Sequence, residues 1–213
     1  MLDLMFSVSG DKIPADHGYY LHSALSDLLP FHHDEKQRGN TGVHPISGTL
    51  CCGRMLVING GSKLILRIAA DRVADYLELC GKQLNIGNHS ISVGIPSSRK
   101  LIPAVALWSR LVTIKGFTTP TEFLDAAHRQ LHELDIGAMA HLVTRRSPVS
   151  TERRTDNLAR SPFVKRTLDI KGRNVVGFSL VVTELTAEES LRLQTQGIGG
   201  RRSMGCGIFV PLR

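Results

Sequence analysis

The sequence predicts an α+β fold in which one order of elements, strand, helix, two strands, helix and strand, occurs twice along 213 residues. Two observations support this prediction. Apolar residues alternate in some short runs, as in strands, and recur every three or four residues in others, as in helices. The second half of the chain also repeats the element order of the first half without repeating its residues. The alternative is a single α+β domain in which this order is a coincidence.

The first half begins with a strand over residues 2–9, in which apolar and polar residues alternate. A helix follows over 16–29, with its apolar residues three and four apart, and Pro30 ends it. The other elements expected in this half are strands over 43–47, 54–58, 63–69 and 89–95, a hairpin turn at Asn59, Gly60 and Gly61, and a helix over 72–82 capped by Asp71.

The second half has strong helix-start signals. Capping boxes run from Thr119 to Glu122 and from Thr186 to Glu189, and each predicts a helix. The first of these helices should stop at Gly137. The strands expected around them are 105–115, 139–145, 163–170, 174–184 and 207–212, with a turn at Lys171 and Gly172.

Each half therefore has the βαββαβ order of a ferredoxin-like unit. We predict tandem ferredoxin-like units over residues 1–100 and 101–213, with their boundary between 97 and 104. This scaffold has many functions, so the function has to be argued from particular residues.

The composition favours a polyanionic partner, because the net charge is +7 and the pI is near 9.5. No run approaches the roughly 18 apolar residues of a membrane span, so no membrane partner is expected. The four cysteines show no Cys-x-x-Cys spacing. We expect them to be buried thiols in a reducing compartment, the cytoplasm.

A glycine-rich loop lies near the C-terminus, with five glycines and two arginines between Gly197 and Phe209. Backbone N–H groups of such a loop can form an anion-binding nest, and arginines can hold phosphate through two donors. The loop follows a helix and precedes a strand, which excludes a Walker or Rossmann loop. A flexible surface connection is the alternative. The expected phosphate-binding residues are Gly197, Gly199, Gly200, Arg201 and Arg202.

A basic segment from Arg145 to Arg166 carries seven cations and two anions over 22 residues, which resembles a nucleic-acid footprint. Aromatic residues make up only 5% of the chain, so binding through phosphates and duplex shape is favoured over base stacking. A solvated surface segment is the alternative. The candidate RNA-binding residues here are Arg145, Arg146, Arg153, Arg154, Lys165 and Arg166.

Histidines and a lysine follow the first helix directly, at His32, His33 and Lys36, and His44 precedes the next strands. Histidine can donate and accept protons near neutral pH, and RNA carries its own nucleophile, the 2′-hydroxyl. These four residues could therefore cleave RNA without a metal or cofactor. His33 is the first choice, because the neighbouring Asp34 and Glu35 could orient its imidazole. A polar loop with incidental histidines is the alternative.

No metal site is expected from the remaining histidines. His128 and His132 have a helical spacing that could ligate a metal, but only Asp125 is a plausible neighbouring ligand, so a solvated helix face is favoured.

The chain resembles the CRISPR repeat-processing endoribonucleases of the repeat-associated (RAMP) superfamily. The resemblance lies in the glycine-rich loop from Gly197 to Gly207, the histidine loop after the first helix and the tandem element order. The runs from Ile13 to Leu25 and from Gly42 to Ile46 are similar to a compact branch of that family.

The resemblance implies metal-free cutting of precursor CRISPR RNA within its repeats, beside a hairpin, with the repeat RNA, mature guide RNA and other subunits of a CRISPR effector complex as partners. The family's general acid or base maps best onto Phe31, His32 and His33, and Lys36 is a candidate for its lysine. The family often places a tyrosine late in the first helix, where this chain has Ser26.

Two other classes of protein stay open. One is a non-catalytic RNA-binding subunit of a CRISPR complex, since such subunits carry similar glycine-rich loops. The other is an unrelated protein with two RNA-recognition sheets, although the aromatic Gly-Phe-x-Phe strand motif of those sheets does not occur in this sequence.

Overall fold

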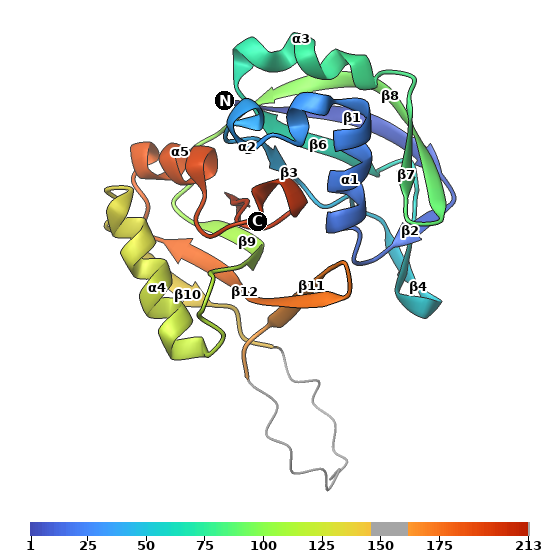
Figure 1. Ribbon diagram of the computed structural model, residues 1–213. Helices are drawn as coiled ribbons and strands as arrows, with labels where there is room; N and C mark the ends of the chain where they lie inside the picture. Colours follow the sequence, from blue (N-terminus) through green and yellow to red (C-terminus); the bar gives the residue numbers. More distant parts are fainter. Residues whose placement is uncertain (146–161, 213) are drawn as a thin grey trace, which may run out of the picture.

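Two antiparallel sheets, one from each half of the chain, form the framework of the molecule (Figure 1). The computed structural model describes residues 1–145 and 162–212. The first sheet has the strand order β3-β6-β1-β8-β7. Its strands are β1 (Leu2–Gly10), β3 (Gly42–Val43), β6 (Lys63–Ile68), β7 (Gln83–Ile86) and β8 (His89–Lys100).

Strand β1 lies at the centre of this sheet, where its alternating pattern separates two environments. Leu4, Phe6 and Val8 are buried in the core of the first half. Asp3 alternates with them, so its carboxylate projects from the opposite face of the sheet. The predicted strand is thus confirmed, and it places one acidic group on the face away from this core.

The helix α1 (Gly18–Leu28) confirms the first helical prediction, with Leu21, Ala24 and Leu25 buried. The predicted helix over 72–82 is only partly formed. Its α-helical part, α3 (Val73–Tyr76), lies between the 3₁₀ turns Ala70–Arg72 and Leu77–Leu79. A 3₁₀ turn repeats every three residues, and Tyr76 and Leu79 are accordingly the buried pair. The cap predicted at Asp71 is wrong, because the residue before α3 is Arg72 and makes no side-chain cap.

A small third sheet, with the order β2-β5-β4, was not predicted. It contains β2 (Lys12–Pro14), β4 (Thr49–Cys51) and β5 (Met55–Val57). The chain does turn at Asn59, where Ser62 N–H donates to the Asn59 carbonyl at 2.9 Å. The predicted hairpin is nevertheless wrong, because β5 pairs with β2 and β4 instead of β6.

The second sheet has the order β10-β12-β9-β13, and β11 extends it by pairing with β12. Its strands are β9 (Leu107–Val112), β10 (Met139–Leu142), β11 (Lys165–Ile170), β12 (Arg173–Thr183) and β13 (Val210–Pro211). The long β12 pairs with β10 near its C-terminal end and with β11 near its N-terminal end. The observed final strand, β13, is much shorter than the strand predicted over 207–212.

A neck of paired backbone lies where the chain passes from β10 to β11. The Arg145 N–H donates to the Pro162 carbonyl at 2.8 Å, and the Val164 N–H donates to the Val143 carbonyl at 2.7 Å. The backbone that ends at residue 145 and the backbone that resumes at residue 162 are thus held together at the edge of the second sheet.

Helices α4 (Pro120–Glu133) and α5 (Ala187–Gln196) pack on the second sheet. The capping box predicted at Thr186 and Glu189 is present in full. The helix predicted after Thr119 also forms, but Thr119 makes no cap bond to the backbone, and its hydroxyl instead donates to the Glu122 carboxylate at 2.6 Å.

The cysteines differ from the expectation of buried thiols. All four are free, but Cys52 and Cys80 are exposed, Cys51 is half-buried and only Cys206 is buried. Cys80 lies after the 3₁₀ turn at Leu77–Leu79, which rotates it away from the face that a continuous helix would bury. No helix in the described part of the chain is both long and apolar enough to cross a membrane.

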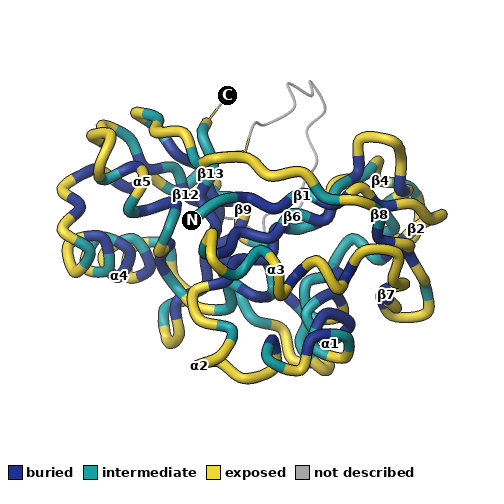
Figure 2. Tube along the Cα trace, turned by 90° about the horizontal axis from the view of Figure 1, so that it is seen from above, coloured by how far each residue is buried: buried dark blue, intermediate teal, exposed yellow. Residues whose placement is uncertain are grey.

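A buried arginine, Arg67, joins the two halves. Arg67 of β6 is 1% exposed, and its Nε and Nη2 donate to the two carboxylate oxygens of Asp3 at 2.8 and 3.2 Å. Its Nη1 donates to the carbonyl oxygens of Gln194 and Phe209, both in the second half, at 3.1 and 2.6 Å. Figure 2 shows buried residues along β1, β6 and β9, the strands on either side of this junction.

Replacing Arg67 should destabilise the protein strongly. Arg67→Met leaves Asp3 buried with fewer partners, and breaking such a pair typically costs about 3–5 kcal/mol. The matched control is Arg99→Met, because Arg99 also donates to Asp3, at 3.0 Å, but its side chain is 45% exposed. We expect the control to cost about 1 kcal/mol or less. Urea unfolding measures both, and equal losses would contradict the role assigned to Arg67.

Candidate functional site

A turn that carries histidines follows α1 directly. Leu29 leaves the helical conformation, and Pro30 begins a 3₁₀ turn, Pro30–His32. His33 ends this turn, and the short helix α2 (Glu35–Arg38) follows. We call residues 31–37 the histidine turn. His33 and Lys36 are exposed on it, whereas His32 is 0% exposed.

His32 is packed inside the histidine turn. The Ser26 hydroxyl donates to the His22 carbonyl at 2.9 Å, so His32 Nδ1 is the donor in its 3.4 Å contact with the same hydroxyl. The rings of His22 and His32 lie 5.3 Å apart. Burial, with the nearby charges of His22, Arg38 and Arg72, lowers the pKa of His32 to about 3. His32 is therefore neutral near pH 7, and its unprotonated Nε2 is buried without a partner in the described structure.

The acidic neighbours of His33 have another task than the one expected. The Asp34 carboxylate accepts from the backbone N–H groups of Lys36 and Gln37 at 2.8 and 3.4 Å, which caps α2. No ion pair joins His33 to Asp34 or Glu35 in the described part of the chain. The idea that these carboxylates orient His33 is therefore corrected, and His33 presents its imidazole to solvent.

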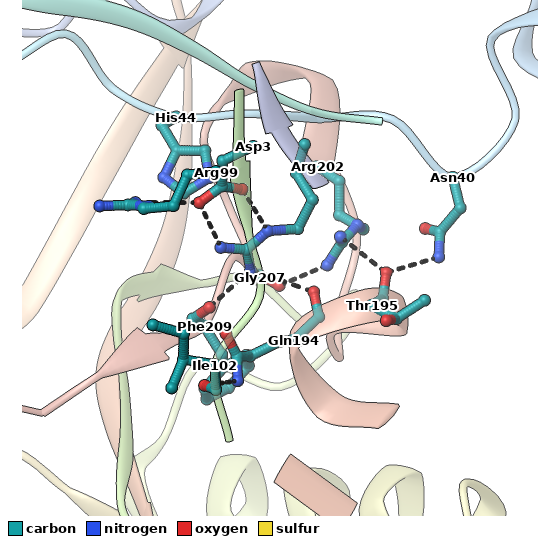
Figure 3. Close-up of polar contacts among 11 residues, drawn as sticks. Asp3, Asn40, His44, Arg99, Ile102, Gln194, Thr195, Arg202, Gly207 and Phe209 are labelled. Atoms are coloured by element: carbon teal, nitrogen blue, oxygen red, sulfur yellow. Dashed lines mark hydrogen bonds and ion pairs between the residues drawn. The ribbon is translucent and has the colours of Figure 1, made fainter. Parts of the chain in front are cut away.

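His44 lies in a different environment, beside Asp3 (Figure 3). Its Nε2 is 3.6 Å from an Asp3 carboxylate oxygen. Burial lowers the pKa of His44 more than the contact with Asp3 raises it. Burial also raises the pKa of Asp3, but His44 and Arg67 outweigh it and hold that pKa well below its usual range. The structure thus groups His44 with Asp3 and Arg67, and brings His32, His33 and Lys36 together elsewhere.

A cavity of about 650 Å³ opens beside His44, between the two halves. Asp3, Arg67, Arg99 and Trp108 line it, and none of them was singled out from the sequence. The available signal was an ionised residue between apolar neighbours in each of two strands, Asp3 in β1 and Arg67 in β6. Their pairing joins residues 64 positions apart, so local patterns could not reveal it.

The glycines of the glycine-rich loop allow close backbone packing. Gly197 and Gly207 have positive φ angles of 64°, and a Cβ at either would approach a backbone carbonyl to within 2.1 and 2.3 Å. A Cβ at Gly205 would lie 3.0 Å from Pro45 of the first half. The loop therefore packs closely against both halves and is not a flexible surface connection.

The expected anion nest is not formed by the three named glycines, because their N–H groups already have acceptors. Gly197 N–H donates to Leu193 O at 2.8 Å, and Gly200 N–H donates to Thr113 O at 2.9 Å. Gly199 N–H donates to the Gln130 side chain at 2.7 Å. These glycines serve the packing of the loop.

The two arginines of the loop differ in their environments. Arg202 donates from Nη1 to Gly207 O at 2.9 Å and from Nη2 to Thr195 O at 3.0 Å (Figure 3). Burial and the charge of Arg67 lower the pKa of Arg202 to about 10, so it stays charged at neutral pH. Arg201 is half-buried and in the left-handed conformation, and its side chain forms no hydrogen bond or ion pair with the described residues.

Part of the basic segment lies on the second sheet. Lys165 is exposed on β11, and Arg145 Nε donates to the Phe163 carbonyl at 3.3 Å. Burial and the charges of Arg110 and Arg145 lower the pKa of Arg166, which indicates a cluster of cations. Arg110 was not singled out from the sequence. Arg146, Arg153 and Arg154 lie outside the described residues.

The described residues contain no cluster of side chains suited to holding a metal ion. Among residues 1–145 and 162–212, no three His, Cys, Asp or Glu residues are grouped for that purpose. His128 Nε2 instead accepts from the Ala140 N–H at 3.2 Å, joining α4 to β10.

Comparison with known proteins identifies the class. Residues 2–213 match the family model described as Cas6 Crispr. The CRISPR-associated endonuclease Cas6 of Myxococcus xanthus is 38% identical over 210 residues, which cover 99% of this chain and 81% of that protein. The chain therefore belongs to the Cas6 family of CRISPR-associated endonucleases.

Solved structures share the fold. A structure described as a RAMP protein binding different RNA substrates has a TM-score of 0.68 and 11% identity, with 100% of each chain covered. A Cas6-related protein from Pyrococcus furiosus has a TM-score of 0.65 and 11% identity, covering 100% of this chain and 98% of that one. A third structure, described as CRISPR associated protein Cas6, has a TM-score of 0.66 and 13% identity, covering 100% and 99%. The α+β fold is thus the fold of Cas6 structures.

The buried histidines should make stability fall in mild acid. The pKa values of His17, His22, His32 and His44 are all lowered, mainly by burial. Their stabilising effect is present above about pH 6.5, the value for an unfolded chain, and is lost as the pH falls, because the unfolded chain then binds more protons. Each can contribute a slope of up to about 1.4 kcal/mol per pH unit.

Urea unfolding at pH 7.5, 6.5 and 5.5 tests this expectation. His32→Leu should reduce the slope, whereas His132→Leu, at an exposed position of α4, should leave it unchanged. A free energy of unfolding that stays constant over this range would contradict the assignment of neutral buried histidines.

Proposed function

We propose that this protein is a metal-independent endoribonuclease that cuts precursor CRISPR RNA within its repeats to give guide RNA. Membership of the Cas6 family supports this proposal. The single observation that carries it is the exposed imidazole of His33, immediately after the buried His32 of the same turn and three residues before the exposed Lys36.

The chemistry that this turn suits is attack by the RNA's own 2′-hydroxyl. The 2′-oxygen bonds to the adjacent phosphorus, and the bond from phosphorus to the leaving 5′-oxygen breaks. The products are a 2′,3′-cyclic phosphate and a 5′-hydroxyl. One group removes the proton from the 2′-hydroxyl and another gives a proton to the 5′-oxygen.

His33 is our first choice for one of these proton transfers, because imidazole changes its charge near neutral pH and this ring is accessible to a substrate. The exposed ammonium of Lys36 would stabilise the negative charge of the pentacoordinate phosphorus. His32, neutral and enclosed, would hold the shape of the turn. His44 is the alternative catalytic histidine, beside the cavity.

RNA would bind through the cations on the second half. Arg201, Arg145, Lys165 and Arg166 are the described candidates, together with Arg110. Arg146, Arg153 and Arg154 complete this proposal from the sequence. Gly197, Gly199 and Gly200 would act indirectly, by fixing the backbone around Arg201.

We also infer that the halves 1–100 and 101–213 are tandem ferredoxin-like units. In each half, the first strand pairs antiparallel with the third and fourth strands of the βαββαβ order. The second strand pairs with the third at the edge of the sheet. The free thiols fit a cytoplasmic enzyme, and the product guide RNA could keep the protein in a larger effector complex.

Replacing His33 should stop cleavage without stopping binding. His33→Ala should slow single-turnover cleavage of repeat RNA by about 10²–10⁴-fold, the usual loss of a general acid or base. Affinity for an RNA with a 2′-deoxy scissile nucleotide, which lacks the nucleophile, should change by less than about 1 kcal/mol. The reactions contain EDTA, and His132→Ala of α4 is the matched exposed control.

The other possible outcomes would change the catalytic site, the mechanism or the class of protein. A full rate for His33→Ala with a slow His44→Ala would move the catalytic site to the cavity. Cutting of the 2′-deoxy substrate, or a strict need for Mg²⁺, would refute the mechanism. Tight binding of repeat RNA by the wild-type protein without any cutting would favour the non-catalytic subunit.

Arg201 and Arg202 should separate into two roles. Arg201→Met should weaken RNA affinity and reduce the log–log salt slope by roughly 0.7–0.9, the value for one phosphate contact, with little change in stability. Arg202→Met should cost about 1–3 kcal/mol of unfolding free energy, because it leaves the Gly207 carbonyl without its donor and removes one of the two donors to Thr195 O. Binding titrations at several salt concentrations and urea unfolding measure the two effects. The reverse pattern would exchange the two roles.

A further inference from the structure

The histidine turn rests against a different helical segment, the one formed by the 3₁₀ turn Ala70–Arg72 and by α3. Phe31, at the start of the turn, packs edge-on against Tyr76, with ring centroids 5.3 Å apart and an interplanar angle of 89°. The Tyr76 hydroxyl lies 2.9 Å from the Thr41 hydroxyl, so its ring is fixed from the other side as well. The Phe31 ring is thus held in place at the start of the turn, and the exposed residues of the turn follow it in the sequence.

Arg72 touches both ends of the histidine turn. Its guanidinium carbon lies 4.6 Å above the centroid of the Phe31 ring, a cation–π arrangement. Its Nη1 donates to the carbonyl oxygen of Gln37 at the other end of the turn. Its Nε donates to the Asp75 carboxylate at 2.5 Å, and this contact orients the planar guanidinium.

The two contacts of Arg72 enclose the residues proposed to act on RNA. His33 and Lys36 lie between Phe31 and Gln37 in the sequence, and both are exposed. Asp34 and Arg38 hold the backbone within the turn, by capping α2 and by donating to the His32 carbonyl at 3.0 Å. Arg72 supplies the connection from the turn to the helical segment after β6, which sets where the turn lies on the first sheet.

Arg72 is also separate from the core. Its side chain is 28% exposed and that of Asp75 is 44% exposed. Exchange of either residue therefore removes polar contacts without opening a cavity in the apolar interior. A local change in the position of the turn is the expected consequence, because the fold of the first sheet does not depend on this pair.

We propose that Arg72 is a positioning residue for RNA cleavage, which holds His33 and Lys36 at the correct distance from the scissile phosphate. This inference rests on the proposed function of His33. Arg72 acts through the turn and does not itself contact RNA. A displacement of about 1 Å in a catalytic group can cost 10²-fold in rate, so the effect should be large in the chemical step and small in binding.

The test uses the full chain with Arg72→Gln, Arg72→Lys and Asp75→Asn. Arg72→Gln should lower the single-turnover rate by roughly 10–100-fold, while the affinity for 2′-deoxy repeat RNA changes by less than about 3-fold. Arg72→Lys keeps a cation over Phe31 and should recover part of the rate. Asp75→Asn leaves the guanidinium in place but weakens its orientation, and should slow cleavage by roughly 3–10-fold. It also keeps the test available if Arg72→Gln folds poorly.

Arg129→Gln is the matched control. Arg129 of α4 also stacks over a phenylalanine, Phe117, at 5.4 Å, and it is exposed on the other half. The Arg129→Gln variant makes the same change of charge and loses the same kind of contact as Arg72→Gln, so its cleavage rate should stay within about 2-fold of the wild-type rate.

A double variant separates positioning from general damage. His33→Ala with Arg72→Gln should lose much less than the product of the two single losses, because one of the two groups that Arg72 positions is already missing and only the effect on Lys36 remains. Multiplied losses would overturn the proposal, as would an Arg72→Gln rate equal to that of Arg129→Gln. A loss of RNA affinity as large as the loss of rate would make Arg72 an RNA ligand instead, and would also overturn it. If His33→Ala alone cuts at the wild-type rate, the proposed function fails first, whatever Arg72 does.

Discussion

The position of the two halves depends on cations that meet the end of α5. The last carbonyl groups of a helix have no partners within it, and the helix dipole makes this end negative. In this protein, Arg67 of the first half donates to Gln194 O, and Arg202 of the glycine-rich loop donates to Thr195 O. Asn40 of the first half adds a donor to Thr195 O at 2.8 Å (Figure 3). Asp3 then balances the charge of Arg67, so the buried ions are paired at the junction.

The histidines have different roles because they differ in burial. His17 is fixed by two backbone partners, since its Nδ1 is 2.9 Å from Pro14 O and its Nε2 accepts from Ile46 N–H at 2.9 Å. His32 and His44 are enclosed and uncharged near neutral pH. His33, adjacent to His32 in sequence, is the one of these four that faces solvent. The 3₁₀ turn Pro30–His32 contributes to this difference, because successive side chains in such a turn point about 120° apart.

The sequence predicted features that depend on neighbouring residues. The alternation in β1, the helical spacing in α1 and the capping box of α5 are local patterns, and the structure confirms each of them. The sequence did not predict features that depend on distant partners. The pairing of β5 with β2 and the carbonyl partners of Arg202 follow from tertiary contacts. In the candidate site, the group of His32, His33 and Lys36 was predictable because it is continuous in sequence, but the burial of His32 and the contacts of Arg72 were not.

The neck between β10 and β11 has a consequence for how such proteins can diversify. The Arg145 N–H donates to the Pro162 carbonyl, so these two residues lie side by side at the edge of the second sheet. Doubling the number of residues between two such closed ends adds only about 0.6 kcal/mol of entropic cost. Natural selection can therefore lengthen, shorten or recharge the sequence between these two residues while the described scaffold stays the same. An engineer could exchange it as a cassette, grafting it between relatives at those two residues.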